Sequence, residues 1–206
     1  MKVLLLNGSP HEKGCTYTAL SEVAAALEGD GVAAEILWLG ASPATGCLGC
    51  GGCRRTGRCV RNDIVNDIIE RLEEYDGLVV GSPVHYASAS GQITGVLDRL
   101  FYAAGGKLRY KPGAAVVSAR RGGTTAALDQ LQKYFTINQM PVVSSRYWNM
   151  VHGNTPDEVR QDEEGLSVMR TLGHNMAWLL KCIAAGRAAG VGLPMEEPPA
   201  KTNFIR

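Results

Sequence analysis

The sequence predicts an open α/β fold, in which a five-stranded parallel sheet carries helices on both faces. Two observations predict this class: the apolar segments are short and uninterrupted, and segments with helical periodicity separate them. An uninterrupted apolar run is typical of a strand that is covered on both faces, as in a parallel sheet. The alternation of such strands with amphipathic helices is typical of α/β architecture.

Each element follows from a local pattern. The apolar runs place strands at residues 3–6, 36–39, 78–80, 114–117 and 141–143. Apolar residues at helical spacing place helices around residues 20–27, 64–72, 93–100, 128–135 and 155–185. We expect Asn62 or Asp63 to cap the second helix. Thr155 and Glu158 form a capping box for the last one, which we expect to be interrupted near Gly173.

Composition excludes several classes of function. The chain has 206 residues, so we expect one domain with an appendage. Its 21 Lys and Arg residues balance 20 Asp and Glu residues, so no overall basic field exists to hold nucleic acid. No apolar stretch approaches the ~20 residues of a membrane helix, and no secretory signal is evident. We therefore expect a cytoplasmic protein that binds neither nucleic acid nor membrane.

Three segments follow predicted strands at the edge of the sheet where open α/β folds bind ligands. Residues 7–18 offer hydroxyls and backbone N–H groups at a helix start, which suit one terminal phosphate or merely cap the helix. Residues 81–91 offer a platform for a flat ring, or a turn in which Tyr86 packs. Residues 118–125 combine arginines with glycines that permit close backbone approach, or form a solvated loop. No G-x-G-x-x-G or P-loop pattern occurs.

Together these segments resemble the flavin loops of the NAD(P)H-dependent FMN reductases, which belong to the flavodoxin-like superfamily. The resemblance rests on Gly8-Ser9-Pro10 through Cys15-Thr16, on Ser82-Pro83-Val84-His85-Tyr86 and on Ser118-Ala119-Arg120 with Gly122-Gly123. It implies that FMN is bound by Ser9, His11, Cys15, Thr16, Thr18, Pro83, Val84, His85, Tyr86, Ser118, Ala119, Arg120, Gly122 and Gly123. It also implies a homodimer or homotetramer that passes electrons from NAD(P)H through FMN to a quinone, nitro compound, free flavin or metal ion. The sequence assigns no catalytic residue.

A cysteine-rich loop at residues 43–61 interrupts the alternation. Cys47, Cys50, Cys53 and Cys59 have the spacing C-x2-C-x2-C-x5-C. Two consecutive x2 gaps let a short turn wrap three corners of a [4Fe–4S] cluster, with the fourth ligand further along. Bound zinc and free or paired thiols remain alternatives. The spacing resembles that of the iron–sulfur flavoproteins, a branch of the same superfamily.

That resemblance implies a second function, in which a ferredoxin-like donor feeds the cluster and the cluster feeds FMN. Arg54, Arg55, Arg58 and Arg61 then balance the cluster charge or dock an acidic donor; otherwise they are a solvated basic loop. A third possibility is a non-enzymatic module with a zinc-stapled loop that binds a partner.

The remaining features concern organisation. We expect residues 1–185 to form a flavodoxin-like FMN-binding domain and residues 186–206 to form a C-terminal arm. The arm is rich in proline and glycine and ends in Phe204-Ile205, so we expect it to lie extended on a neighbouring subunit rather than in disorder. Cys182 is expected in the core, and His152 and His174 are expected to be structural.

Overall fold

The computed structural model describes residues 1–200 and 202, and it confirms the predicted α/β class. Parallel strands lie in the order β2-β1-β3-β5-β6, which is the flavodoxin-like order. Their bounds are β1 (Lys2–Asn7), β2 (Ala33–Trp38), β3 (Gly77–His85), β5 (Gly113–Ala119) and β6 (Met150–His152). The two-residue strand β4 (Ser88–Ala89) pairs antiparallel with the end of β3.

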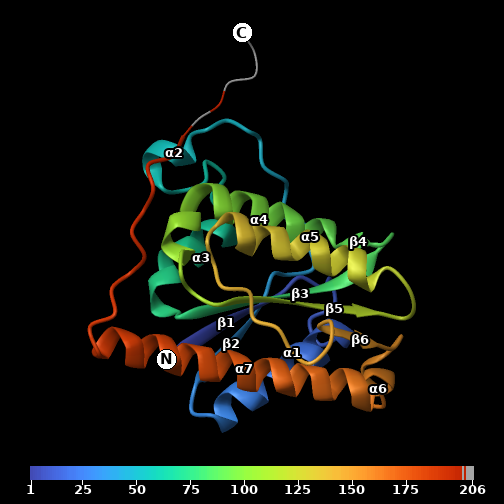
Figure 1. Cartoon of the computed structure of the whole chain (residues 1–206). Helices are drawn as coiled ribbons and strands as arrows, with labels where there is room; N and C mark the ends of the chain where they lie inside the picture. The colour runs from blue at the N-terminus through green and yellow to red at the C-terminus, as the bar shows by residue number, and fades with distance from the viewer. Residues whose placement is uncertain (201, 203–206) are drawn as a thin grey trace.

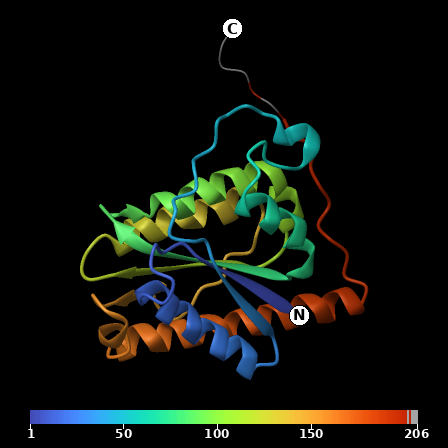
Figure 2. The same cartoon turned by 180° about the vertical axis from the view of Figure 1, so that it is seen from behind.

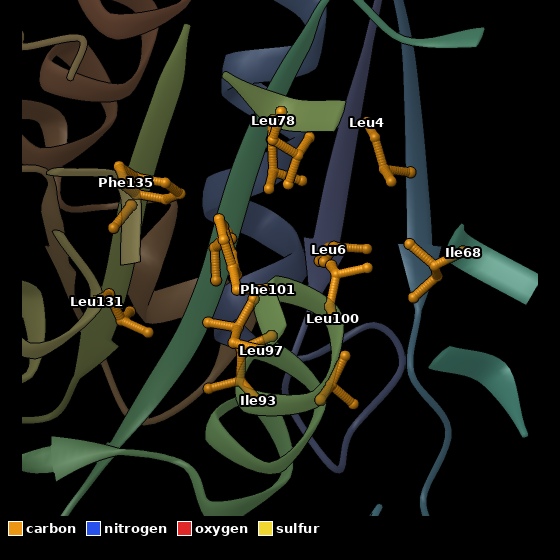
Figure 3. Packing of buried hydrophobic residues seen from close by; sticks show 14 of the residues in the cluster. Leu4, Leu6, Ile68, Leu78, Ile93, Leu97, Leu100, Phe101, Leu131 and Phe135 are labelled. Carbon is orange, nitrogen blue, oxygen red and sulfur yellow. The ribbon is translucent and has the colours of Figure 1, made fainter. Parts of the chain in front are cut away.

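Helices cover both faces of the sheet (Figures 1 and 2). One face carries α3 (Ile64–Arg71), α4 (Gly91–Ala104) and α5 (Thr124–Ile137), and the other carries α1 (Cys15–Gly29) and α7 (Glu163–Ala188). The strands divide their side chains accordingly. On β1, Leu4 and Leu6 pack with the α4 side, as Figure 3 shows, while Val3 and Leu5 pack with the α1 side.

Short elements complete the chain. They are α2 (Cys53–Thr56), α6 (Pro156–Val159) and the 3₁₀ turns η1 (Leu72–Glu74) and η2 (Gly105–Leu108). Asp63 is the N-cap of α3, as expected, and its side chain accepts a hydrogen bond from the Val65 N–H. No helix in the described part of the chain is both long and apolar enough to cross a membrane.

The predicted fifth strand at residues 141–143 is wrong in its position. Val142 forms only an isolated bridge with Gly113, through the Pro141 carbonyl and the Val143 N–H. Pro141 has no N–H to donate, and the chain then leaves the sheet. It returns as β6, where Met150 pairs with Val117.

The predicted last helix is in fact two helices. Thr155 caps α6, but the Glu158 side chain accepts from the Asn154 N–H and so does not close the expected box. Asp162 then caps the long helix α7. The expected interruption at Gly173 does not occur. A Cβ there would lie 2.6 Å from Ala26 Cβ, so this glycine lets α7 pack closely against α1.

The expected burial of Cys182 on α7 is wrong. Cys182 is exposed, although Leu180 beside it is 3% exposed. Two residues are about 200° of rotation on a helix, which turns Cys182 toward solvent. His174 on the same helix is exposed, and its Nδ1 lies 2.7 Å from Asp30 Oδ2, so its expected structural role stays a prediction.

The C-terminal segment after α7 has no regular structure in its described part. Residues 191–200 are exposed, and Glu196 forms an ion pair of 2.7 Å with Arg109 of the same chain. Phe204 and Ile205 lie outside the described residues. The expected contact of the arm with a neighbouring subunit stays a prediction.

An ion-pair network on β2 predicts a pH effect on stability. Glu35 accepts hydrogen bonds from Arg71 and Tyr75 and pairs with Lys2 Nζ at 2.7 Å. Arg71 contributes most to lowering the pKa of Glu35 to about 2. Because the folded-state pKa is depressed, this stabilisation is present above about pH 4.5 and is lost as the pH falls toward 2.

We therefore expect Glu35→Gln to lower the free energy of unfolding at pH 7 by about 1–2 kcal/mol, less than the shift alone implies because the carboxylate is partly exposed. The variant should also lose less stability than the parent between pH 5 and pH 3. Denaturant unfolding at several pH values measures both effects. Glu73→Gln is the control, because the Glu73 side chain is 76% exposed. Equal acid sensitivity in Glu35→Gln and the parent would refute the assignment.

Candidate functional site

The first candidate loop is fixed by its own hydrogen bonds. Asn7 accepts from the Ser9 N–H at 3.1 Å, and Ser9 Oγ accepts from the His11 N–H at 3.1 Å. Trp38, at the end of β2, donates its indole N–H to the Ser9 carbonyl at 2.8 Å. The loop leads into α1, whose N-cap Gly14 provides no side-chain hydrogen bond. The first turn of α1 thus offers backbone N–H groups to an anion.

Hydrogen bonds join the three predicted loops to one another. Ser90, which caps α4, donates its hydroxyl to the Gly8 carbonyl at 2.8 Å. Gly8 N–H in turn donates to the Gly81 carbonyl at the end of the buried part of β3. The hydroxyls of Thr16 and Ser118 lie 2.9 Å apart, which links the start of α1 to the end of β5. The structure therefore brings the loops together, as their places after parallel strands predict.

The second loop is a tight hairpin between β3 and β4. Its two turn residues, Tyr86 and Ala87, have left-handed φ values of 50° and 57°. Such values in two consecutive non-glycine residues are strained and are typical of a type I′ turn, which glycine and asparagine usually supply. Gln130 of α5 anchors the hairpin by accepting from the Ser88 hydroxyl and the Ala89 N–H.

The third loop packs closely against the turn of this hairpin. Gly123 precedes α5 with a φ of +94°, and a Cβ there would lie 2.7 Å from the Ala87 Cα. Neighbouring Gly122 has open space around it. Only a glycine at position 123 therefore lets the third loop approach the hairpin this closely.

The predicted flavin-loop residues divide into buried and exposed groups. Ser9, Thr16, Thr18 and Ser118 are buried, and Thr18 donates its hydroxyl to the Gly14 carbonyl. Pro83, Val84, Ala119 and Gly123 are half-buried at the rim, whereas His11, His85, Tyr86, Arg120 and Gly122 are exposed. The arrangement is thus a polar, internally bonded base with exposed rings and cations around it.

Cys15 is placed against the protein interior. Its thiol lies 3.7 Å from the Gly153 carbonyl, and the side chain packs against the α1–α7 core. Burial raises the pKa of this thiol, although the start of a helix usually lowers it. Cys15 is therefore a packing residue of the loop rather than an activated thiol.

The cysteine loop forms a second candidate site, beside α4 on the side that faces away from the sheet (Figure 1). All four cysteines of the C-x2-C-x2-C-x5-C motif line one cavity of about 310 Å³, together with Arg99 and Tyr102 of α4. Arg99 lies about 12 Å along α4 from Gly91, where the helix leaves the flavin loops. The two candidate sites therefore occupy different ends of one helix.

The donor set of this cavity is four cysteine thiols, which suit either an iron–sulfur cluster or zinc. Within residues 1–200 and 202, no three His, Cys, Asp or Glu side chains converge on one point. Zinc would bind four sulfurs at about 2.3 Å from one centre, and a cluster would spread its four cysteines around a larger body, so the thiols would have to move together for zinc and less so for a cluster. Gly49, Gly51 and Gly57 have left-handed φ values, which give the loop the turns it needs to enclose such a body.

Helix α4 guides the chain from β2 into this loop. Gln92 of α4 donates to the carbonyls of Leu39 and Gly40. One turn further on, a Cβ on Gly95 would lie 2.9 Å from the Ala44 carbonyl. A stripe of small and polar residues on α4 thus lets the chain from β2 run against this helix toward the cysteines.

Arg99 is the residue of this site that the sequence analysis missed. It is 2% exposed, and it pairs with both carboxylate oxygens of Asp63 at 2.7 and 2.8 Å. Burial favours the neutral form of Asp63, but the hydrogen bonds from Arg99 and Val65 outweigh it and lower the pKa of this carboxyl. The same pair raises the pKa of Arg99, so both groups are charged.

Comparison with known proteins places the chain in a family. A model of the NADPH-dependent FMN reductase family matches residues 1–155, well over half of the sequence. The chain belongs to this family. Membership makes it a flavodoxin-like, FMN-binding oxidoreductase, as its resemblance predicted.

Relatives of this FMN reductase family member include proteins named iron–sulfur flavoproteins. An iron–sulfur flavoprotein of Methanocaldococcus jannaschii is 32% identical over 191 residues, which cover 89% of this chain and 99% of that protein. An iron–sulfur flavoprotein of Archaeoglobus fulgidus is 31% identical over 80% of this chain and 83% of its own length.

Solved structures agree on the fold of this family member. An NAD(P)H:quinone oxidoreductase from Methanothermobacter marburgensis superposes with a TM-score of 0.64 at 18% identity, covering 85% of this chain and 96% of that one. An archaeal flavodoxin superposes with a TM-score of 0.60 at 15% identity, covering 88% and 99%. At these identities the likeness concerns the fold alone.

Proposed function

We propose that this chain is an oxidoreductase of the iron–sulfur flavoprotein type, with FMN at the sheet edge and a [4Fe–4S] cluster in the cysteine cavity. The observation that carries the proposal is that four cysteines from one short motif line a single cavity. Motif spacing and the names of the two relatives support it. In this proposal residues 1–185 are the FMN-binding domain and residues 186–206 the arm.

The three loops would bind FMN with separate tasks. The phosphate would bind at Ser9 Oγ and at the start of α1, which has no side-chain cap. The paired hydroxyls of Thr16 and Ser118 would lie beneath this position. The flat ring would lie along Pro83–Tyr86 and the third loop, against a hairpin that Gln130 and Gly123 hold in place. When bound, FMN exchanges electrons singly or in pairs and a cluster exchanges them singly, so the chain's role is to bind, orient and shield the two groups.

An acidic, ferredoxin-like protein is the electron donor that this arrangement suits. The cavity is lined by exposed Arg54 and half-buried Arg61, and by the exposed side chains of Leu48 and Val60. Arg55 and Arg58 are exposed on the same loop, where Arg58 pairs with Glu70. Positive charge around an apolar mouth favours docking of an acidic partner, in a salt-dependent way.

A second candidate route, in which NAD(P)H reduces FMN directly, has its own support. Tyr86 is fully exposed at the hairpin tip, and Arg120 and Arg121 are exposed beside it. These groups suit stacking with a nicotinamide ring and pairing with nucleotide phosphates. In this route a quinone, nitro compound, free flavin or metal ion would take the electrons, and a homodimer or homotetramer would be the working form.

Anaerobic reduction of the FMN-loaded protein distinguishes the two routes. We expect a reduced ferredoxin to bleach the flavin absorbance quickly, and NADH and NADPH to do so slowly or not at all. Rapid bleaching by a nicotinamide nucleotide without any donor protein would favour the second route. Failure of all three donors would exclude both.

The bound flavin should be FMN and not FAD. The first loop provides one helix start for one phosphate, and the chain has no G-x-G-x-x-G motif for a dinucleotide. Heat denaturation followed by chromatography of the released flavin tests this expectation. Recovery of FAD would contradict it.

A further inference from the structure

Arg99 is a buried cation on α4, and it uses every N–H group of its guanidinium. Besides its two bonds to Asp63, it donates to the carbonyls of Thr45 and Arg61 at 3.4 and 3.2 Å. Its fifth donor, Nε, points to Cys59 Sγ at 3.2 Å. A fully satisfied, planar fork of this kind holds its partners in one geometry.

Cys59 is held from two helices, unlike the other cysteines of the motif. Asn66 of α3 accepts from the Cys59 N–H at 2.9 Å and donates to the Cys59 carbonyl at 3.0 Å. Arg99 of α4 then fixes the sulfur itself. By contrast, the Cys53 thiol has one contact with α4, to the Tyr102 carbonyl at 3.6 Å. Cys47 and Cys50 are exposed on the loop, where the only hydrogen bond to either sulfur from a described residue is that of the Gly49 N–H, 3.4 Å from Cys47 Sγ.

We propose that Arg99 is a positioning residue that holds Cys59 as the fixed corner of the cluster site and makes the reduction potential of the bound cluster less negative. This inference rests on the proposed function. Arg99 acts through Cys59 and is not itself a ligand, because guanidinium has no lone pair to give.

The direction of the effect follows from charge. One-electron reduction makes a cluster and its cysteine sulfurs more negative, so an N–H group that donates to a ligand sulfur stabilises the reduced form. Asp63 neutralises most of the guanidinium charge at longer range. What acts on Cys59 is therefore the directed Nε–H group, and losing it should move the potential to a more negative value.

Redox titration followed by electron paramagnetic resonance tests the proposal on anaerobically reconstituted protein. In Arg99→Lys the ammonium keeps the positive charge beside Asp63, but the Nε–H group that donates to Cys59 Sγ is lost. The reduction potential of the cluster should therefore become more negative. Arg58→Lys is the matched control, because Arg58 pairs with Glu70 at the surface and, among the described residues, donates to no cysteine sulfur. Its potential should equal that of the parent. FMN content and thermal unfolding verify that each variant is folded.

Asp63→Asn separates tuning from simple loosening of the loop. Asparagine can still cap α3 and accept one bond from Arg99, but it leaves the guanidinium charge uncompensated, so the potential should stay the same or become less negative. A more negative reduction potential in Asp63→Asn would overturn the proposal. This outcome can be measured even if Arg99→Lys retains no cluster. An unchanged potential in a cluster-loaded Arg99→Lys would overturn the role of Arg99 alone. A parent that takes up no iron and sulfide would overturn the proposed function and this role together.

Discussion

Cys59→Ala should lose most of the cluster iron and the broad visible absorbance while keeping its FMN. Each cysteine supplies one corner of a [4Fe–4S] cluster, so losing one exposes an iron to solvent and oxidation. Cys59 lies outside the run formed by Cys47, Cys50 and Cys53, and a plain glycine-rich turn would not need it. The flavin should remain because the three loops that would bind it lie at the other end of α4.

Iron analysis and flavin absorbance on anaerobically prepared protein measure the two effects. Cys182→Ala is the matched control, since this cysteine is exposed on α7 and does not line the cavity. It should keep both groups. Retention of full iron by Cys59→Ala, or loss of FMN in proportion to iron, would contradict the assignment.

Gly123→Ala should weaken FMN binding by about tenfold or more and destabilise the fold. The new Cβ would lie 2.7 Å from the Ala87 Cα in the hairpin turn, and alanine would have to adopt a φ of +94°. Left-handed backbone and overpacking each cost about 1–3 kcal/mol, and about 1.4 kcal/mol corresponds to a tenfold change in affinity. The hairpin would have to move away from the third loop to relieve the clash.

Fluorescence titration of the apoprotein with FMN, together with thermal unfolding, measures these losses. Gly122→Ala is an unusually close control, because a Cβ on this adjacent glycine would meet no atom within 4 Å and its φ is not left-handed. It should change stability by less than about 0.5 kcal/mol. Equal FMN affinity in the two variants would show that the hairpin contact does not matter for binding.

Much of the fold could be predicted because the central strands carry a strong signal. The runs at residues 3–6, 78–80 and 114–117 are fully buried, so their composition follows directly from their position in the sheet. β6 could not be found in this way. It has only three residues, of which His152 is exposed, so it contains no apolar run. It pairs with β5 where the chain returns to the sheet at Met150, after leaving it at residue 143.

Helix α7 shows where local patterns mislead. An isolated glycine costs helix stability, so the sequence predicts an interruption at Gly173. The reason for this glycine is tertiary: it makes room for α1, which no local pattern reveals. The apolar neighbours of Cys182 predict a core position, although the helical period places it on the opposite side from Leu180.

The candidate site was predictable in its motifs but not in its supports. Strand order brings the three loops together, and the cysteine spacing predicts one shared site. Arg99 gave only a weak signal, because a single arginine in an amphipathic helix usually lies on the solvated face. Its position two helical turns after Gln92 was the available clue, since both side chains are buried on the stripe that faces the cysteine loop.

The central claim is that the four cysteines hold a [4Fe–4S] cluster in a chain that also binds FMN. Anaerobic purification, followed by assays of iron, acid-labile sulfide and flavin on the same sample, tests it most directly. The account predicts about four iron and four sulfide for each FMN, with a broad absorbance beneath the flavin bands. Protein that contains FMN but neither iron nor sulfide, even after anaerobic reconstitution, would contradict it and leave a flavin-only reductase with four thiols beside α4.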